Sequence, residues 1–343
     1  MQNIDRNAYL AYSEKFTENE MLLRDEFSEW LPECIIDCHA HCNLPEHVLS
    51  IDDRSYHHML STFPSFSLVE SRHWHGLFYP GKRLRTLRFP KTFRGIDHRR
   101  ANLYLLEESL EGDRVALYGL PDDVPYTIDT LSHPRVSALK MYYSYLNPPA
   151  TEVYQYFPPP VLEVAERLSI PIILHPPRVI TKCIDQLLRL LQDFPALRVS
   201  VAHMGLTKCL VPGLREAYEQ LARFESVVLD TSMVPSAEVI LLGLQVFGLE
   251  RVMFGSDEPL SLIRAATYEH PEFGQRLMTE YPYHWVNPSE QSSYRHLVPA
   301  GITHCHWQCM AAIKAALTQL ADGMQVTAKQ NLFHNNAKNF FGF

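Results

Sequence analysis

The sequence has no run of apolar residues that approaches the ~20 needed to cross a bilayer, so we expect no membrane-spanning helix. Its start, MQNIDRNAYLAYSEKF, lacks a basic segment followed by an apolar one, and we therefore expect no secretory signal peptide. The 7 cysteines are an odd number scattered over 343 residues, which argues against a disulfide framework. Reduced thiols in a cytoplasmic protein are the simplest interpretation.

Motifs for nucleotide binding and for a serine nucleophile are also missing. The sequence contains no P-loop and no G-x-G-x-x-G pattern, and Gly255-Ser256-Asp257 does not match the G-x-S-x-G nucleophile elbow. It shows no internal repeat and no low-complexity tract. A chain of this length buries roughly three-quarters of its unfolded surface, so a metal site would serve function rather than hold the fold together.

Positive charge is in short supply. Lys and Arg total 31 against 39 Asp and Glu, and the formal charge of −8 argues against a general binder of nucleic acid or membrane surfaces. Nine basic residues nevertheless lie between Arg72 and Arg100, against the single acid Asp97. Such a segment on an acidic protein suggests a small anionic ligand, although a solvated surface face explains it equally well.

What the sequence does contain is a series of short apolar runs, most of them followed by a segment with helical spacing. The predicted strands cover residues 34–39, 83–89, 114–120, 136–142, 171–175, 198–203, 226–230 and 251–254. The predicted helices cover 98–110, 160–168, 184–194, 214–224, 237–247 and 309–321. This alternation indicates βα units and a parallel sheet. Eight strands fit an α/β fold of the closed (β/α)8 TIM barrel class better than an open sheet.

Length alone allows two domains, but α/β barrels run to about 250 residues or more as one unit. We therefore predict a single TIM-barrel domain over residues 1–343, with its first strand within residues 33–41. Two connections are unusually long, residues 42–82 after the first strand and residues 258–303 after the eighth. Connections of this length usually carry function, so we expect both to be loop insertions that cover the active face.

Several predicted strands end on a side chain that can bind a metal. The first ends at His39-Ala40-His41, and because side chains alternate along a strand, both imidazoles should face the same way. In a parallel barrel the carboxyl ends of all strands meet at one face. Residues far apart in the sequence are therefore expected around one centre: Lys140 from the fourth strand, His175 from the fifth, His203 from the sixth and Asp257 just past the eighth.

Three ordered motifs and the C-terminal tail carry a family resemblance. The motifs are His39-Ala40-His41 after Ile-Ile-Asp, Val201-Ala202-His203-Met204-Gly205 and Met253-Phe254-Gly255-Ser256-Asp257, and the tail runs from Asn335 to Gly342. Together they resemble the amidohydrolase superfamily, in particular its amidohydrolase-2 branch of metal-dependent TIM-barrel hydrolases and decarboxylases. The agreement runs in order from Ile35 to the C-terminus and is weak through residues 45–82 and 259–303.

The resemblance implies that His39, His41, His175 and Asp257 are metal ligands. It implies that His203 either binds a second metal or forms a hydrogen bond near the substrate. In binuclear members a lysine at the position of Lys140 is carboxylated and bridges two metals, whereas mononuclear members lack this bridge. The alternative for Lys140 is a lysine that pairs with Asp257 or with a substrate carboxylate.

The ligand set indicates the metal and its chemistry. Imidazole and carboxylate ligands suit one or two divalent transition-metal ions, with zinc as the first choice and manganese, iron, cobalt or nickel as alternatives. Such an ion lowers the pKa of a bound water to about 7 and polarises a carbonyl group. We expect Asp257 to act as general base and then as general acid, and His203 to polarise the carbonyl or to stabilise negative charge.

Candidate substrate contacts come from the basic segment and from the two long connections. Arg88, Lys91 and Arg94 should lie at or just beyond the end of the second strand on the active face. Arg94 is the preferred partner of a substrate carboxylate, because a guanidinium can bind a carboxylate with two hydrogen bonds. Trp74 and Trp285 lie in aromatic segments of the long connections, where each could line the pocket or simply anchor its loop by burying a ring.

The sequence thus predicts an enzyme, a metal-dependent hydrolase that uses metal-activated water on an amide, ester or lactone bond of a small, carboxylate-bearing substrate. A non-oxidative decarboxylase or hydratase of an unsaturated or aromatic carboxylic acid, with the same metal site, is the first alternative. A catalytically inactive binding protein is the second. The expected partner is a small anionic molecule rather than nucleic acid or a membrane, and assembly into a homo-oligomer stays open.

Overall fold

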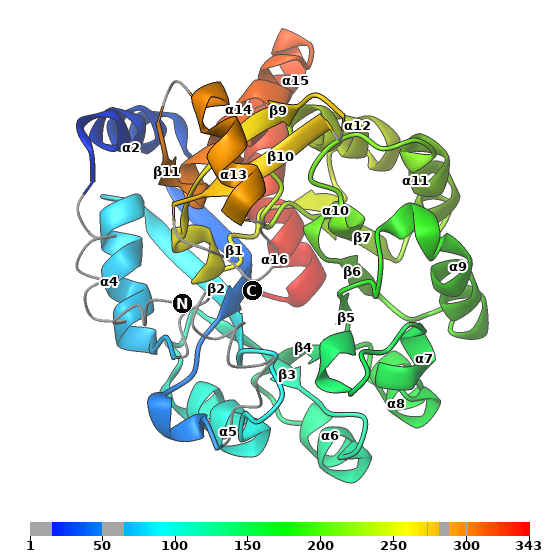
Figure 1. Ribbon diagram of the computed structural model, residues 1–343. Helices are drawn as coiled ribbons and strands as arrows, with labels where there is room; N and C mark the ends of the chain where they lie inside the picture. The colour runs from blue at the N-terminus through cyan, green and yellow to red at the C-terminus, as the bar shows by residue number, and fades with distance from the viewer. Residues whose placement is uncertain (1–15, 50–64, 273, 281–287, 299–300) are drawn as a thin grey trace.

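Eight parallel strands form the centre of the molecule (Figure 1). The computed structural model describes residues 16–49, 65–272, 274–280, 288–298 and 301–343. The strands pair in chain order, and all eight predicted strands are present. They are β1 (Cys34–His41), β2 (Arg83–Phe89), β3 (Arg114–Tyr118), β4 (Val136–Met141), β5 (Ile172–Leu174), β6 (Val199–Val201), β7 (Val227–Asp230) and β8 (Val252–Met253).

The segment that follows β8 closes the sheet against β1. The His41 N–H donates to the carbonyl of Glu258 at 2.7 Å, and the Asp257 N–H donates to the carbonyl of His39 at 2.8 Å. Ala40 and Glu258 form an isolated parallel bridge. Helices alternate with the strands, so the fold is the predicted (β/α)8 TIM barrel.

The six predicted helices are all present within a few residues of their expected limits: α5 (His98–Glu108), α8 (Pro159–Arg167), α9 (Ile184–Asp193), α11 (Leu214–Ala222), α12 (Ala237–Phe247) and α14 (Cys305–Thr318). Their apolar residues recur at helical spacing; in α9, Leu187, Leu190 and Leu191 are buried. Helices that the periodicity did not predict include α2 (Glu18–Trp30), α6 (Val124–Leu131), α7 (Val153–Tyr156) and α15 (Asp322–Gln330). No helix in the described part of the chain is both long and apolar enough to cross a membrane.

The two long connections differ from the expected loops. Residues 42–82 include α4 (Leu68–Phe78), which occupies the place of the first barrel helix between β1 and β2. Ser67 begins α4 with a capping box, since its hydroxyl accepts from the Glu70 N–H while Glu70 accepts from the Ser67 N–H. Residues 68–78 therefore belong to the barrel itself, and the active-face insertion stays a prediction for the rest of this stretch.

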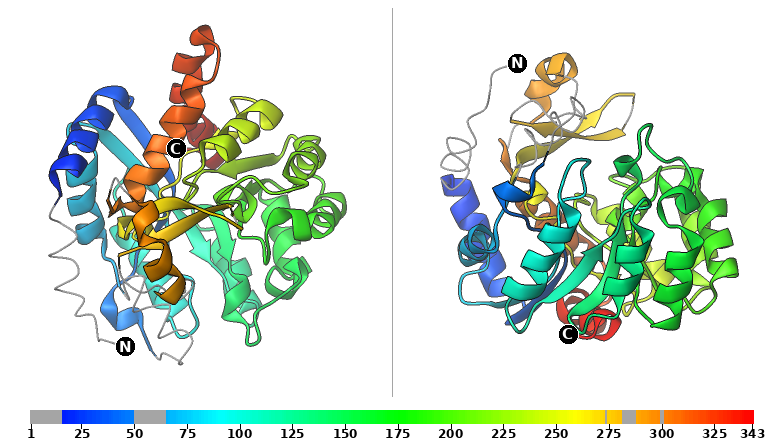
Figure 2. Two further views of the ribbon diagram at one scale, coloured as in Figure 1. Left: turned by 45° about the horizontal axis from the view of Figure 1, so that its top comes forward. Right: turned by 90° about the horizontal axis from the view of Figure 1, so that it is seen from below.

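The described part of residues 258–303 likewise contains regular elements. They contain β9 (Arg264–His270) and β10 (Gly274–Thr279), which pair antiparallel, and the short helix α13 (Pro288–Tyr294). The edge strand β11 (Thr303–His304) pairs with β9 on its other side. This small sheet lies at the end of the barrel opposite α16 (Asn336–Phe341), as the right-hand view of Figure 2 shows.

The barrel interior is filled by side chains from the strands and closed from below by the C-terminal helix. Ile36, Leu87, Ile173 and Met253 belong to one buried cluster with small residues of the other strands. Phe340 and Phe341 of α16 join this cluster. The interior between the strands is therefore a packed core rather than a pore.

Candidate metal centre

Two histidines of β1 and one aspartate after β8 converge at the carboxyl ends of the strands. Oδ1 of Asp257 lies 3.2 Å from Nε2 of His41 and 3.6 Å from Nε2 of His39. One donor atom from each of the three residues lies within 4.8 Å of the others, a spacing that can hold a metal ion. All three side chains are buried or nearly so, although they come from opposite ends of the sequence.

The second ring nitrogen of each histidine is held by an acceptor. Nδ1 of His39 lies 3.0 Å from Oδ2 of Asp230, and Nδ1 of His41 lies 3.1 Å from the carbonyl of Pro90. Because an ionised carboxylate and a carbonyl oxygen can only accept, Nδ1 of each neutral ring must carry the proton, which leaves a lone pair on Nε2. Lone pairs and a carboxylate oxygen this close repel each other unless a cation lies between them. The three residues therefore fit a transition-metal ion, with outer partners that fix the ring orientation.

A local irregularity in β1 turns His39 toward the centre. The register between β1 and β2 shifts between Asp37 and Ala40, and Cys38 joins the buried barrel cluster. The buried carboxylate of Asp37 accepts hydrogen bonds from the N–H of His39 at 3.0 Å and of Ser256 at 2.9 Å. Burial raises the pKa of Asp37 to about 6, and these hydrogen bonds oppose that effect. Asp37 thus ties β1 to the segment that carries Asp257.

Two of the site residues adopt backbone conformations that non-glycine residues rarely take. Asp257 has φ of 62° and His203 has φ of 54°, and the short turn α10 (His203–Leu206) continues with positive φ at Met204, Gly205 and Leu206. The Asp230 carboxylate accepts from the His203 N–H at 2.9 Å and supports this turn. Such strained positions cluster at functional sites, where the surrounding structure holds them in place.

His203 and His175 form the opposite wall of the centre. The His203 ring lies 4.9 Å from the His39 ring and 5.1 Å from the His175 ring, measured between centroids. In both, Nδ1 faces a carbonyl, that of Ser232 at 2.9 Å for His203 and that of Pro176 at 3.0 Å for His175. Their Nε2 atoms therefore carry the lone pair, as in His39 and His41.

Burial keeps these imidazoles neutral. It lowers the pKa of His39 and His41, lowers that of His175 well below its ordinary value, and lowers that of His203 to about 4. Neutral imidazole is the form that binds metals. Burial also opposes ionisation of Asp230, but its interactions with His39 and Ser232 outweigh that effect and lower its pKa.

Lys140 of β4 is fully buried beside the centre. Its Nζ has no hydrogen-bond partner among the residues that the structure describes, and it lies 5.2 Å from the centroid of the Phe89 ring and 5.9 Å from that of Tyr142. Burial lowers the pKa of Lys140 to about 8, while Asp230 and Asp257 act in the opposite direction. An amine with a lowered pKa is a better nucleophile, so this lysine suits either carbamate formation or contact with a substrate.

The three basic residues expected to bind substrate lie in different surroundings. Arg88 is buried, and its guanidinium donates to Asp113 at 3.1 Å and to Ser71 at 2.7 Å, so it is committed within the protein. Lys91 is buried near His41, whose pKa its charge lowers further. Arg94 is exposed and lies near Tyr145, a rim residue that follows β4.

The two tryptophans expected at the pocket have separate outcomes. Trp74 is buried in α4, with its ring 5.6 Å from Phe78 and 5.8 Å from His304. The structure therefore favours the alternative in which Trp74 anchors its segment by packing. Trp285 lies outside the described residues.

Sequence reasoning missed two supports of the centre. Asp230, at the end of β7, was not singled out, because a carboxylate at a strand end has no distinctive spacing; its position in the strand-end series could have indicated it. Glu258 was also missed. Its buried carboxylate accepts from Ser71 at 2.6 Å, lies 3.1 Å from Nε2 of His75 and fastens the segment after β8 to α4.

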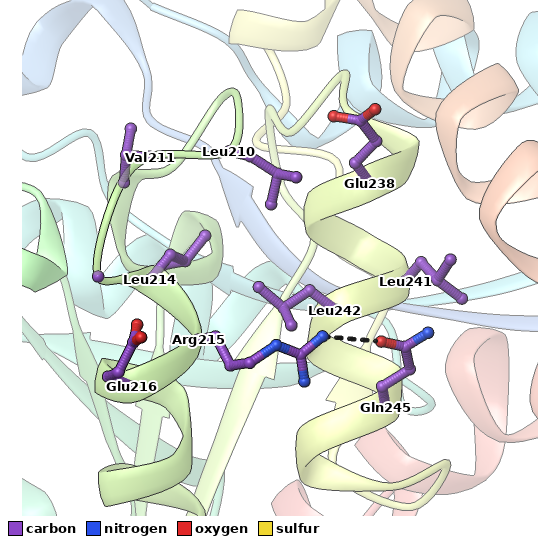
Figure 3. A pocket seen from close by; sticks show the side chains of 10 residues that line it. Leu210, Val211, Leu214, Arg215, Glu216, Glu238, Leu241, Leu242 and Gln245 are labelled. Carbon is purple, nitrogen blue, oxygen red and sulfur yellow. Dashed lines mark hydrogen bonds between the residues drawn. The ribbon is translucent and has the colours of Figure 1, made fainter.

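A hollow of about 380 Å³ lies between α11 and α12, on the outside of the barrel (Figure 3). Leucine side chains line its middle, and Arg215 and Gln245 bond across it at 3.3 Å. It contains none of the residues of the metal centre.

Comparison with known proteins agrees with this geometry. The model of the amidohydrolase family matches residues 131–343, more than half of the chain. The protein therefore belongs to the amidohydrolase family and is an enzyme of the kind that the motifs predicted. No curated protein sequence matches the chain.

Solved structures with the same fold share little sequence with this chain. An amidohydrolase from Burkholderia multivorans with bound zinc is 12% identical, with a TM-score of 0.54 and coverage of 90% of this chain and 99% of that one. A candidate 2-pyrone-4,6-dicarboxylic acid hydrolase from Acinetobacter baumannii, with citric acid bound, is 15% identical, with a TM-score of 0.55 and coverage of 90% of this chain and 99% of that one. The 5-carboxyvanillate decarboxylase of Novosphingobium aromaticivorans, with manganese and a nitrobenzoic acid, is 13% identical, with a TM-score of 0.52 and coverage of 92% of this chain and 97% of that one.

Proposed function

We propose that this protein is a metal-dependent hydrolase that cleaves an amide, ester or lactone bond of a small substrate carrying a carboxylate. The observation that carries the proposal is the convergence of two imidazole lone pairs and one carboxylate oxygen at the strand ends. Each imidazole is fixed by a partner on its other nitrogen. Such an arrangement binds a cation and has no evident role in packing.

His39, His41 and Asp257 would hold the ion, with His175 completing the set. Zinc suits these ligands best, and manganese, iron, cobalt or nickel are alternatives. When bound, the ion supplies Lewis acidity and an activated water. We propose one ion rather than two, because the only described group of donors with metal-ligand spacing is this one. Under this proposal Lys140 is a free amine beside the substrate.

The chain's own groups would handle the proton and the substrate. Oδ1 of Asp257 faces the two imidazoles, while Oδ2 has no hydrogen bond to any described residue. Oδ2 is therefore free to take a proton from the attacking water and to deliver it to the leaving group. His203 would orient the substrate carbonyl from the opposite wall. Lys91 and Arg94 would bind the substrate carboxylate at the mouth of the barrel.

Decarboxylation of an aromatic acid is the second candidate. The observation that favours it is an aromatic wall beside His175, where the Tyr143 ring stacks at 5.2 Å and the Tyr142 ring meets the histidine edge-on at 4.7 Å. Such a wall could accept a planar ring next to the metal. The related decarboxylase with a bound nitrobenzoic acid offers a parallel for that reaction.

Metal content and product analysis test these readings. Protein purified without chelator should contain about one transition-metal ion per chain, and His39→Ala and Asp257→Asn should each abolish activity while the circular dichroism spectrum is kept. Carbon dioxide released without consumption of water would indicate the decarboxylase. If no metal binds and added metal restores no activity, both enzymatic proposals fail.

The Lys140→Met variant tests whether the centre holds one metal ion or two. If the lysine is a free amine, the variant keeps its metal content and the wild type does not respond to bicarbonate. A loss of half the metal in the variant, together with activation of the wild type by bicarbonate, would show instead that a carboxylated Lys140 bridges two ions.

A further inference from the structure

A cavity of about 850 Å³ lies at the end of the barrel opposite the metal centre. Its walls come from the amino-terminal ends of β3, β4, β5 and β6 and from α16, the helix below the barrel in the right-hand view of Figure 2. The metal centre lies at the carboxyl ends of the same strands, so the two sites are separated by the packed interior. This volume is within the range of small-molecule sites.

Three partly buried arginines line this cavity: Arg114, Arg135 and Arg198. Each is held in place by backbone carbonyls. Arg114 donates to Gly342 at 2.9 Å, Arg135 donates to Leu106 at 2.7 Å and to Ser109 at 2.6 Å, and Arg198 donates to the carbonyl of Phe340. These bonds fix the guanidinium groups but bring no formal negative charge.

The lack of a counter-ion sets these residues apart from other buried arginines of the protein. Arg88 pairs with Asp113 at 3.1 Å, and Arg264 pairs with Glu20 at 3.0 Å and with Glu280 at 3.1 Å. No described carboxylate forms an ion pair with Arg114, Arg135 or Arg198. Burial lowers the pKa of Arg198, and no acid offsets the effect. A partly buried cation without a counter-ion is unfavourable, so an anion would stabilise it.

The other polar groups of the cavity leave its charge positive. Asp113 lines the wall, but its carboxylate is taken up by Arg88 and by the Thr86 N–H at 2.9 Å. Glu111 lies exposed at the rim. Ser109 also lines the cavity and adds no charge to it.

We infer that this cavity is a binding site for a small organic or inorganic anion with carboxylate or phosphate groups, which we call the basal anion site. The three guanidinium groups are held in advance, so little conformational entropy is lost when an anion binds. Guanidinium recognises both kinds of anion through paired hydrogen bonds. The site does not depend on the reaction at the metal centre.

Isothermal titration of the metal-loaded protein tests the inference. Tricarballylate probes for carboxylates and inorganic phosphate probes for phosphates. At least one of the two should bind with about one ligand per chain, raise the melting temperature as its concentration rises, and bind more weakly as salt is added. Failure of both to bind at millimolar concentration would overturn the inference.

Two variants and a matched control assign the binding to this cavity. Arg135→Gln and Arg198→Gln should each weaken binding by about tenfold or more, because each removes charge-assisted hydrogen bonds. Arg251→Gln is the control. Arg251 also donates to helix-end carbonyls, those of Ala222 and Phe224 at 3.1 Å, but it does not line the cavity.

The control separates a structural role of the arginines from ligand binding. Binding that is unchanged in Arg251→Gln and weakened in the other two variants supports the basal anion site. Binding that survives in Arg135→Gln and Arg198→Gln would place the anion at the metal centre and overturn the inference. If Arg198→Gln does not fold, Arg198→Lys should keep the fold and still bind more weakly, since lysine loses the paired geometry.

Discussion

His39 and Asp230 are joined by a hydrogen bond of 3.0 Å between Nδ1 and Oδ2, which connects the end of β1 to the end of β7. The same carboxylate accepts from the N–H of His203, so one buried side chain orients two of the four imidazoles of the centre. The geometry of the candidate metal centre therefore depends on a residue outside the group of proposed ligands.

Asp230→Asn should weaken metal binding by about 10-fold to 100-fold, because the amide is a poorer acceptor for the His39 N–H and fixes the ring less firmly. Competition with a chromogenic chelator measures the affinity. Asp129→Asn, an exposed change on α6, is the control and should have no effect. Equal affinities for the two variants would contradict the role given to Asp230.

Gly255→Ala should disturb the centre by steric contact. A Cβ at this position would lie 2.9 Å from Cβ of His39 and 3.2 Å from Cβ of Ser232, so β1 and the segment after β8 would have to separate. We expect lower metal occupancy and lower activity. Gly76→Ala, which meets no atom within 4 Å, should leave both unchanged. A Gly255→Ala protein with normal occupancy would show that the strands can move apart without affecting the ligands.

Ser71→Ala should destabilise the contact between α4 and the segment after β8. The hydroxyl donates to Glu258 at 2.6 Å and accepts from Arg88 at 2.7 Å, so its removal leaves two buried charged groups with one partner fewer. The free energy of unfolding should fall by about 1–3 kcal/mol in urea denaturation. Ser132→Ala on the surface should change it by less than about 0.5 kcal/mol.

Glu20 should contribute to the stability of the protein at neutral pH and lose that contribution in acid. Its carboxylate, fully buried in α2, lies 2.6 Å from Nδ1 of His304 and 3.0 Å from Nη1 of Arg264. Burial opposes its ionisation, but the interactions with His304 outweigh burial and lower the pKa of Glu20 from 4.5 to about 2.

The sign of the effect follows from this lowered pKa. Well above pH 4.5 the carboxylate is charged in both the folded and the unfolded state, and the native pairing stabilises the fold by about 3 kcal/mol. As the pH falls from 4.5 to 2, this stabilisation is lost. Urea denaturation between pH 2 and pH 6 should show that the free energy of unfolding depends less steeply on pH for Glu20→Gln than for the wild type. Glu18→Gln should behave like the wild type, because the Glu18 side chain is exposed at the start of the same helix. Parallel curves for all three proteins would argue against the pairing.

Several features could be predicted from the sequence because they depend on local pattern. Short runs of β-branched and apolar residues predicted the eight strands, and the spacing of leucines predicted helices such as α9. The spacing of His39 and His41 placed both imidazoles on one side, even though the register of β1 shifts between Asp37 and Ala40. Helix α4 was not predicted, because its polar residues Glu70, Arg72 and His73 interrupt the apolar period of a helix that is buried along one face.

Other features could not be predicted from local pattern. Arg88 and Arg94 are the same residue type in the same basic segment. Arg88, however, lies in a strand and pairs with Asp113, while Arg94 lies beyond the strand and is exposed. Trp74 packs against Phe78 and against His304 of β11 rather than facing a pocket. The roles of Asp230 and Glu258 depend on contacts with residues about 190 positions away in the chain.

The sequence by itself therefore determined the barrel and the residues able to bind a metal, since both follow from periodicity and from the side chains at strand ends. Only the tertiary structure decided which of the polar residues converge on the candidate metal centre, which contact those residues from behind and which serve packing. The physical reason is that a buried charge is stabilised by the partner it meets in space. Closure of β8 onto β1, which brings Asp257 to His39 and His41, sets those partners for this protein.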